Sequence, residues 1–215
     1  MRETFHKELE RLDQDVVRMG ALVEAAIEKA TLALVENDTE LARKVMEGDD
    51  EIDALFLDIE KRALAMLAQQ QPVAGDLRLI VTILRAVNDL ERSGDLAFNI
   101  ASVVRKGHEI VALKTVNSIV YELGNAARRL LSQSLDAWAS KDVALAAEME
   151  QLDDEIDELY ARLLKALFAL SQETTFELAL DLVLVGRYFE RIADHAVNMA
   201  ERIRYFVTGD EEHLG

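Results

Sequence analysis

The chain lacks cysteine altogether and holds one proline and nine glycines among its 215 residues. At average usage, a chain of this length would contain about 11 prolines and about 15 glycines. The absence of cysteine excludes a disulfide framework, thiolate zinc sites, iron–sulfur clusters and cysteine catalysis. The shortage of glycine and proline argues against an all-β protein, which needs many turns. The length nevertheless suffices for one large domain or two small ones with a buried core.

Long apolar runs are also missing. No stretch of about 18 apolar residues occurs, so we expect no membrane span, and the first residues lack the apolar region of a signal peptide. We therefore expect a cytoplasmic protein. Acidic residues outnumber basic ones 41 to 24, which gives a net charge of -17. This charge argues against binding to DNA or RNA, and it permits cation binding and docking on basic surfaces of other proteins.

Apolar residues recur at helical spacing along almost the whole chain. We expect an all-α protein with more than about 80% of its residues in helix, against roughly one third in an average globular protein. The six expected long helices cover residues 7–36, 39–70, 74–106, 112–140, 142–170 and 176–206, with breaks at 37–38, 71–73, 107–108 and 172–175. Because the connections are short, neighbouring helices must run antiparallel, as in a helix bundle.

The second half of the chain repeats the first. A shift of 104 positions aligns residues 49–53 with residues 153–157, and both segments read DDEID. A shift of 99 positions then aligns residues 91–101 with residues 190–200, including an identical Glu-Arg pair and an identical Asp. We therefore expect two tandem, sequence-related, antiparallel three-helix bundles, one over residues 1–107 and the other over residues 108–215.

Each unit carries two pairs of acidic residues four positions apart, one pair on its second helix and one on its third. The pairs are Asp49 with Asp53 and Glu91 with Asp95 in the first unit, and Asp153 with Asp157 and Glu190 with Asp194 in the second. All of them lie beside the apolar seam of their helix. Counting residues to the turn between the two helices places the four carboxylates of each unit at one level of an antiparallel hairpin.

Four carboxylates at one level repel one another and raise one another's pKa. Multivalent cations would offset this repulsion, because carboxylate oxygens suit Mg, Ca, Mn, Fe or Zn. The amide oxygens of Asn99 and Asn198 could then complete the ligand shell. The competing interpretation is a solvated acidic flank whose charge is partly offset by salt bridges and by Arg92 and Arg191. The repetition of the arrangement in both units favours metal binding.

Two further polar residues lie in or near the expected apolar seams. Ser93 is the one polar member of the seam on the third helix. His195 follows Asp194, and successive helical residues point about 100° apart. We therefore expect His195 to be a surface or interhelical residue and not a metal ligand.

Residues 91–101 (ERSGDLAFNIA) and 190–201 (ERIADHAVNMAE) resemble the paired signature of the PhoU family. Residues 49–53, 71–78, 19–20 and 24–27 also fit, so the resemblance covers nearly the whole chain. It implies a six-helix protein made of two similar three-helix bundles. It also implies a non-enzymatic, negative regulator of phosphate uptake, which links the ATPase subunit of the phosphate ABC transporter to a membrane sensor histidine kinase that controls phosphate-starvation genes.

The resemblance also implies multinuclear iron or zinc clusters on the carboxylates of the acidic pairs, while Mg, Mn and Ca stay open. Carried over by motif, the ligands are Asp49, Asp53, Glu91, Asp95, Asp153, Asp157, Glu190 and Asp194. The first signature departs from the family at Ser93, where an apolar residue is usual, and at Ser102, where the second signature has Glu201. We therefore expect the first cluster to be looser or differently loaded than the second.

Two questions stay open at this stage. The alternative function is a carboxylate–metal enzyme of the helix-bundle class, with hydrolase or redox activity. An enzyme site normally needs a sheltered pocket and an open metal position, whereas polar stripes beside a seam indicate shallow, exposed sites. The exposed flanks of long bundles could support a homodimer, and we expect contact with the membrane only through partner proteins.

Overall fold

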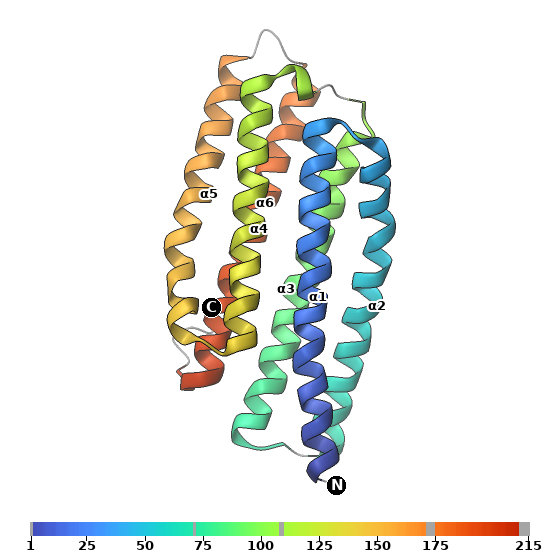
Figure 1. The fold of residues 1–215 in the computed structure, drawn as a ribbon, viewed down its shortest axis with the longest axis vertical. Helices are drawn as coiled ribbons and strands as arrows, with labels where there is room; N and C mark the ends of the chain where they lie inside the picture. Colours follow the sequence, from blue (N-terminus) through green and yellow to red (C-terminus); the bar gives the residue numbers. More distant parts are fainter. Residues whose placement is uncertain (1, 71, 108–109, 171–174, 211–215) are drawn as a thin grey trace.

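The computed structural model describes residues 2–70, 72–107, 110–170 and 175–210. In these ranges the chain forms α1 (Arg2–Glu36), α2 (Thr39–Gln70), α3 (Ala74–Val104), the 3₁₀ turn η1 (Ile110–Ala112), α4 (Lys114–Ser140), α5 (Val143–Ala169) and α6 (Phe176–Thr208), and it forms no strand there (Figure 1). The expected all-α class and the six helices are confirmed. The largest difference in bounds is that α1 begins at Arg2 and not near residue 7. Residues 71, 108 and 172–174, which belong to the expected breaks, lie outside the described residues.

The turns between α1 and α2 and between α4 and α5 have the same construction. Asn37 and Lys141 end the first helix of each pair in the left-handed conformation, with φ of 56° and 55°. Asp38 and Asp142 follow, and each side chain accepts hydrogen bonds from the backbone N–H groups two and three positions further on. These aspartates are N-caps, which satisfy donors that the first turn of a helix leaves free. The repeat seen in the sequence is therefore also present in the backbone hydrogen bonds.

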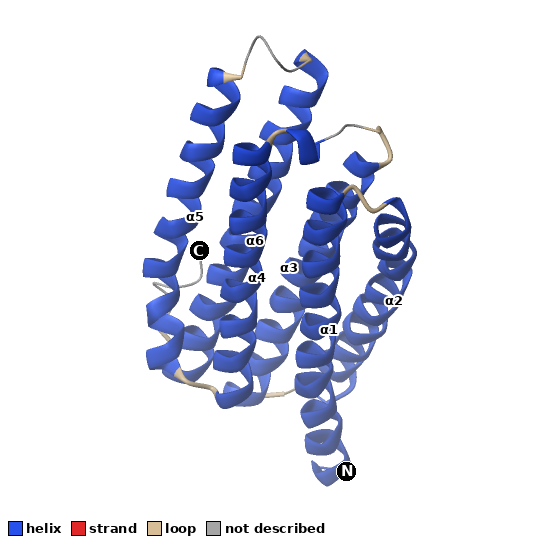
Figure 2. Cartoon of the chain, turned by 45° about the horizontal axis from the view of Figure 1, so that its top comes forward, coloured by secondary structure: helices blue, strands red, loops and turns tan. Residues whose placement is uncertain are grey.

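Four helices form the centre of the molecule. α1 and α4 pack side by side in one layer, and α3 and α6 pack side by side in the other. α2 covers one edge against α1 and α3, and α5 covers the opposite edge against α4 and α6 (Figure 2). The α2–α3 and α5–α6 hairpins point to opposite ends of the molecule (Figure 1). In the described residues no helix is both long enough and apolar enough to cross a membrane.

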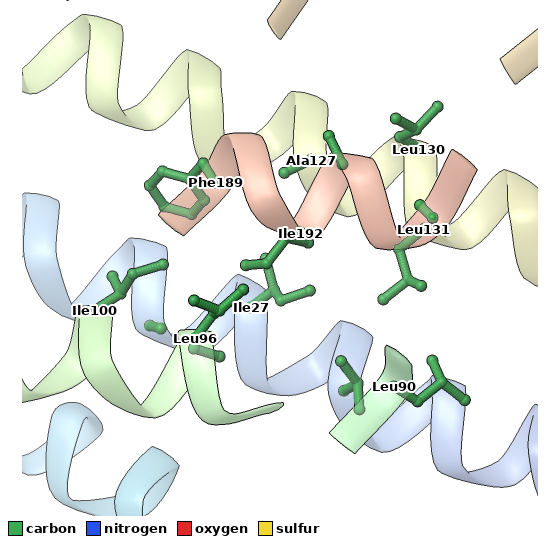
Figure 3. Close-up of a cluster of buried hydrophobic side chains, with 14 of the residues drawn as sticks. Ile27, Leu90, Leu96, Ile100, Ala127, Leu130, Leu131, Phe189 and Ile192 are labelled. Atoms are coloured by element: carbon green, nitrogen blue, oxygen red, sulfur yellow. The ribbon is translucent and has the colours of Figure 1, made fainter. Parts of the chain in front are cut away.

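One continuous apolar core runs through both repeats. It includes Ile27 of α1, Leu90 of α3 and Phe189 of α6, all of which are fully buried (Figure 3). The seams expected on residues 79–104 and 178–206 are buried along most of their length, and only their ends are partly exposed. The two three-helix units therefore share a core across the centre of the molecule. Their boundary near residue 107 stays a sequence prediction.

Two ion pairs link α3 to α6 across their antiparallel crossing. Arg202 of α6 pairs with the buried carboxylate of Asp89 in the middle of α3. Lys106, just beyond the C-terminus of α3, lies 2.6 Å from the buried carboxylate of Asp181 on α6. A buried charge is costly unless it is paired. Sliding α3 along α6 would separate both pairs at once, so the pairs select one register for the two repeats.

The crossing of α1 and α4 depends on two glycines that the sequence repeat aligns. A Cβ on Gly20 would lie 2.2 Å from Leu135 Cδ2, and a Cβ on Gly124 would lie 2.3 Å from Thr31 Oγ1. Adding the repeat shift of 104 to Gly20 and Thr31 gives Gly124 and Leu135, so the two contacts are equivalent. Each glycine thus makes room for a side chain of the other repeat.

We expect Gly124→Ala to lower the free energy of unfolding by about 1–3 kcal/mol, because the new methyl group overpacks the α1–α4 contact. Gly48→Ala is the matched control, since no atom lies within 4 Å of its Cβ position. It should raise the free energy of unfolding by about 0.5–1 kcal/mol, because alanine stabilises a helix interior relative to glycine. Urea unfolding followed by circular dichroism measures both values. Equal effects of the two substitutions would contradict the close approach.

Candidate functional site

The first acidic cluster lies along the groove between α2 and α3. Asp49 and Asp53 come from α2, and Glu91 and Asp95 come from α3. Asp49 Oδ1 lies 3.5 Å from the position that a Cβ on Gly94 would take, so the side chain of Asp49 reaches across to α3. Asp49 and Glu91 are half-buried, whereas Asp53 and Asp95 are exposed. The residues therefore flank the core, as their place beside the seam predicts.

The four carboxylates of this cluster influence one another across the groove. Burial raises the pKa of Asp49 to about 6, and the charges of Asp53 and Asp95 add to the rise. Burial also raises the pKa of Glu91, with contributions from Asp95 and Asp53 that Arg92 opposes. The pKa of Asp95 is raised by burial and by Asp53. The influence of the α2 acids on the α3 acids indicates that the two pairs lie near each other, as residue counting predicts.

The second cluster, between α5 and α6, has the same four positions and one additional cation. Burial raises the pKa of Asp153 to about 6, and the negative charges of Asp194 and Asp157 reinforce this shift. The pKa of Asp194 is raised by burial and by Glu190, and it is opposed by Arg187. Arg187 forms an ion pair with Glu190, one helical turn further on. Sequence analysis did not identify Arg187, although its position three residues before Glu190 on one helix is typical of an ion pair.

The two clusters differ at this cation. The repeat shift of 99 places Asn88 at the position of Arg187, so the first cluster has no equivalent ion pair. In the second cluster, Glu190 Oε2 is buried and has no hydrogen-bond partner. An unsatisfied carboxylate oxygen inside a groove of acids is an acceptor available to a cation.

The side chains do not form a ready-made metal site. Within the described ranges, no group of three or more acidic or histidine side chains is arranged so that it could hold a metal ion. The donor set nevertheless has the chemistry that hard divalent cations prefer, and the exposed carboxylates can change rotamer without disturbing the core. Asn99 is exposed and Asn198 is half-buried, each one turn beyond its cluster. The four acids of each cluster lie near one another. Metal binding by these acids and a role for the two amides stay predictions.

Ser93 and His195 form a buried hydrogen-bonded pair where α3 crosses α6. Ser93 Oγ donates to the carbonyl of Asp89 at 2.8 Å and lies 3.0 Å from His195 Nδ1. Because the only hydroxyl proton is used on Asp89, the Nδ1–H group of His195 donates to Ser93. Burial, together with the positive charges of Arg191 and Arg92, lowers the pKa of His195 to about 4. The expectation that His195 is an interhelical residue is confirmed.

The partner of Ser93 explains why the seam contains a serine. Under the repeat shift of 99, Ser93 corresponds to Ile192 and His195 corresponds to Leu96. Leu96 and Ile192 belong to the same apolar cluster at this crossing (Figure 3). One side of the crossing is therefore a polar pair, and its equivalent on the other side is apolar. Ser93, at which the first signature departs from the family, and His195 of the second signature thus satisfy each other's hydrogen-bonding groups.

Both clusters and the Ser93–His195 pair lie in two segments, residues 16–104 and 120–203, that match the family model of the PhoU domain. The chain belongs to the PhoU family. It is 38% identical over 212 residues to the phosphate-specific transport system accessory protein PhoU homolog of Synechocystis sp., which covers 98% of this chain and 94% of that protein. It is 41% identical over 187 residues to the homolog of Aquifex aeolicus, which covers 86% of this chain and 84% of that protein.

Solved PhoU structures have the same fold. The crystal structure of PhoU from Pseudomonas aeruginosa matches with a TM-score of 0.86 at 34% identity and covers 96% of this chain and 100% of that chain. The structure of the phosphate transport system regulatory protein PhoU from Streptococcus pneumoniae matches with a TM-score of 0.86 at 29% identity, covering 96% and 98%. The resemblance read from the two signatures is therefore confirmed at the level of family and fold.

Asp49→Asn combined with Asp153→Asn should reduce the pH dependence of stability. Their pKa values of about 6 in the folded protein exceed the ordinary value of 3.8. The folded protein therefore binds more protons than the unfolded chain between these values, and the free energy of unfolding falls as the pH rises through this window. In chelator, we expect the wild type to be more stable at pH 5 than at pH 7, and the double variant to lose part of this difference.

Urea unfolding at the two pH values measures the effect. Glu10→Gln with Glu148→Gln is the control, because both carboxylates are exposed and lie outside the clusters. If the control changes the pH dependence as much as the cluster variant does, the raised pKa values are not its source.

Proposed function

We propose that this PhoU-family protein is an accessory protein of a phosphate-specific transport system and a negative regulator of the phosphate-starvation response. The observation that carries the proposal is the match to two PhoU domains along nearly the whole chain, with relatives that bear the name of accessory protein. In this proposal the protein is cytoplasmic and links the ATPase subunit of the phosphate ABC transporter to the membrane sensor histidine kinase.

The proposed action is binding and not catalysis. Long helices held by one shared core present rigid faces, which suits an adaptor that must contact two partners. The net charge of -17 favours basic patches on those partners and speeds their encounter. The acidic side chains flank the core where α2 meets α3 and where α5 meets α6, with Asp53, Asp95, Asp157 and Asp194 exposed to solvent, so water is not excluded as it is in most enzyme sites.

We further propose that metal ions bind to the two acidic clusters. Iron or zinc, or alternatively Mg, Mn or Ca, would neutralise the repelling carboxylates and connect α2 to α3 and α5 to α6. The pKa values of Asp49 and Asp153 are raised first by burial and then by the neighbouring carboxylates, and this second contribution supports the view that the clusters hold negative charge that a cation could offset. Glu190 Oε2 supplies a buried, unpaired acceptor in the second cluster.

Glu190→Ala combined with Asp194→Ala should remove the metal of the second repeat and leave the fold intact, because both residues flank the core. We expect roughly half of the bound metal to be lost if the two clusters load equally, as measured by elemental analysis of purified protein. Glu10→Ala with Glu148→Ala removes the same charge from exposed sites outside the clusters and should lose none. Full metal content in the first variant would disprove the ligand assignment, and unfolding would show a structural role.

Deleting the gene should leave phosphate-starvation genes switched on in rich phosphate, because the inhibitory link to the kinase is gone. Reporter expression in high and low phosphate measures this, together with co-purification of the protein with the transporter ATPase and the kinase. Normal repression in the deletion strain, with no second homologue present, would reject the adaptor. Turnover assays with phosphoesters and peroxide would then test the carboxylate–metal enzyme, the alternative function.

A further inference from the structure

The outer face of the α5–α6 hairpin carries an apolar groove near the end where its two helices are connected. The groove has a volume of about 470 Å³, and its lining includes Leu164, Phe168, Phe176, Ala179, Leu180 and Val183. The rings of Phe168 and Phe176 are among the most exposed apolar side chains, with 86% and 85% of each residue accessible to solvent. Contiguous exposed apolar side chains of this size usually mark an interaction site.

The groove is a property of the second repeat and not a requirement of the fold. The repeat shifts of 104 and 99 place Leu64 at the position of Phe168 and Leu77 at the position of Phe176. These leucines are smaller and less exposed, at 50% and 41%. Glu60 stands at the position of Leu164, so a charge interrupts the equivalent surface of the first repeat. The same hairpin can thus be built without two exposed aromatic rings.

The second acidic cluster lies on the same two helices, beyond the groove. Seven residues separate Leu164 from Asp157 on α5, and seven residues separate Val183 from Glu190 on α6. At 1.5 Å per residue, each distance is about 10 Å, or two helical turns. α5 also carries exposed Asp154 and Glu158 beside this cluster, whereas Glu155 pairs with Arg129 of α4. The face is therefore apolar toward the hairpin connection and carries a net negative charge about 10 Å further along both helices, where Arg187 offsets part of the charge.

We propose that this face binds an amphipathic helix of a partner protein, with large apolar side chains at one end and Lys or Arg side chains two turns away. Helices commonly bind by laying an apolar face into a groove, and the adjacent carboxylates select basic residues by charge complementarity. The inference rests on the proposed adaptor function for the existence of a partner, whereas the chemistry of that partner follows from the groove and its acidic neighbour.

A second copy of this chain fits the face less well. Two copies could cover each other's apolar ends, but both acidic ends would stay uncompensated, because the chain is acidic overall. A basic partner helix, by contrast, uses both ends of the face.

The test uses a fluorescein-labelled 18-residue helical peptide, with Leu and Phe on one face of its first half and Lys on the same face of its second half. A control peptide of the same composition has these residues interspersed. Fluorescence anisotropy in chelator measures the dissociation constants for the full-length protein. We expect the segregated peptide to bind about tenfold or more tightly than the control peptide, because only it can match both ends of the face.

Phe168→Ser with Phe176→Ser should weaken binding of the segregated peptide about tenfold or more, since exposed aromatic anchors supply much of the binding energy of such interfaces. Leu64→Ser with Leu77→Ser is the matched variant at the equivalent positions of the first repeat and should change binding less than about twofold. All four side chains are at least 41% exposed, so the variants should fold, as checked by thermal melts. Equal weakening by both variants, or equal binding of both peptides, would overturn the proposal.

Two further measurements separate the remaining outcomes. If sedimentation shows a wild-type dimer that Phe168→Ser with Phe176→Ser converts to a monomer, a second copy covers the groove and the proposal is wrong. If the peptide results hold but the wild type fails to co-purify with the transporter ATPase and the kinase, the docking face stands and the proposed function fails. If co-purification succeeds while the peptide results fail, the adaptor stands and this face is not its docking site.

Discussion

The antiparallel crossing of α3 and α6 is the constraint on which the rest of the structure depends. Both signature segments lie at this crossing, and each one serves two purposes on different sides of its helix. The inward side packs the two repeats together through Ser93, His195, Leu96 and Ile192. The outward side carries acids toward the flanking helix, α2 or α5. Two ion pairs between α3 and α6 fix the register, so the position of each acidic cluster follows from the packing of the core.

This arrangement accounts for how the protein retains two groups of mutually repelling carboxylates. Partial burial and repulsion between like charges both destabilise the ionised carboxylates, and together they raise the pKa values of Asp49 and Asp153. The core beneath is apolar and continuous through both repeats, so it supplies stability that does not depend on the grooves. The clusters are thus placed where ligand binding can change their charge without changing the packing.

The parts of the fold that depend on local rules could be predicted from the sequence. Helix rise is constant, so counting residues back from a turn sets Asp49 and Asp53 level with Glu91 and Asp95. Contacts between repeats depend instead on how two helices cross, which the periodicity of one helix does not contain. The pairing of Ser93 with His195 was therefore not foreseen, although Ser93 stood out in its seam. The aligned glycines Gly20 and Gly124 could have indicated the close approach of α1 and α4.

The details of the clusters were beyond sequence reasoning for a different reason. Ligand geometry depends on the rotamers of exposed carboxylates, and the spacing of acids along a helix leaves those rotamers open. The sequence could therefore place eight acids in two groups, but it could not say whether they converge on an ion. The ion pair of Arg187 with Glu190 likewise depends on side-chain direction, and it offsets charge in one cluster only.

The two halves have diverged at the surface much more than in the backbone. The turns at Asn37 and Lys141 are built alike, yet exposed Phe168 stands where the first repeat has Leu64, and exposed Arg187 stands where it has Asn88. A shared core requires both repeats to keep their seams, whereas exposed positions are free of this constraint. Duplication therefore gives one rigid body with two similar acidic grooves in different surroundings. Such a body can present different surfaces to different partners without a second fold.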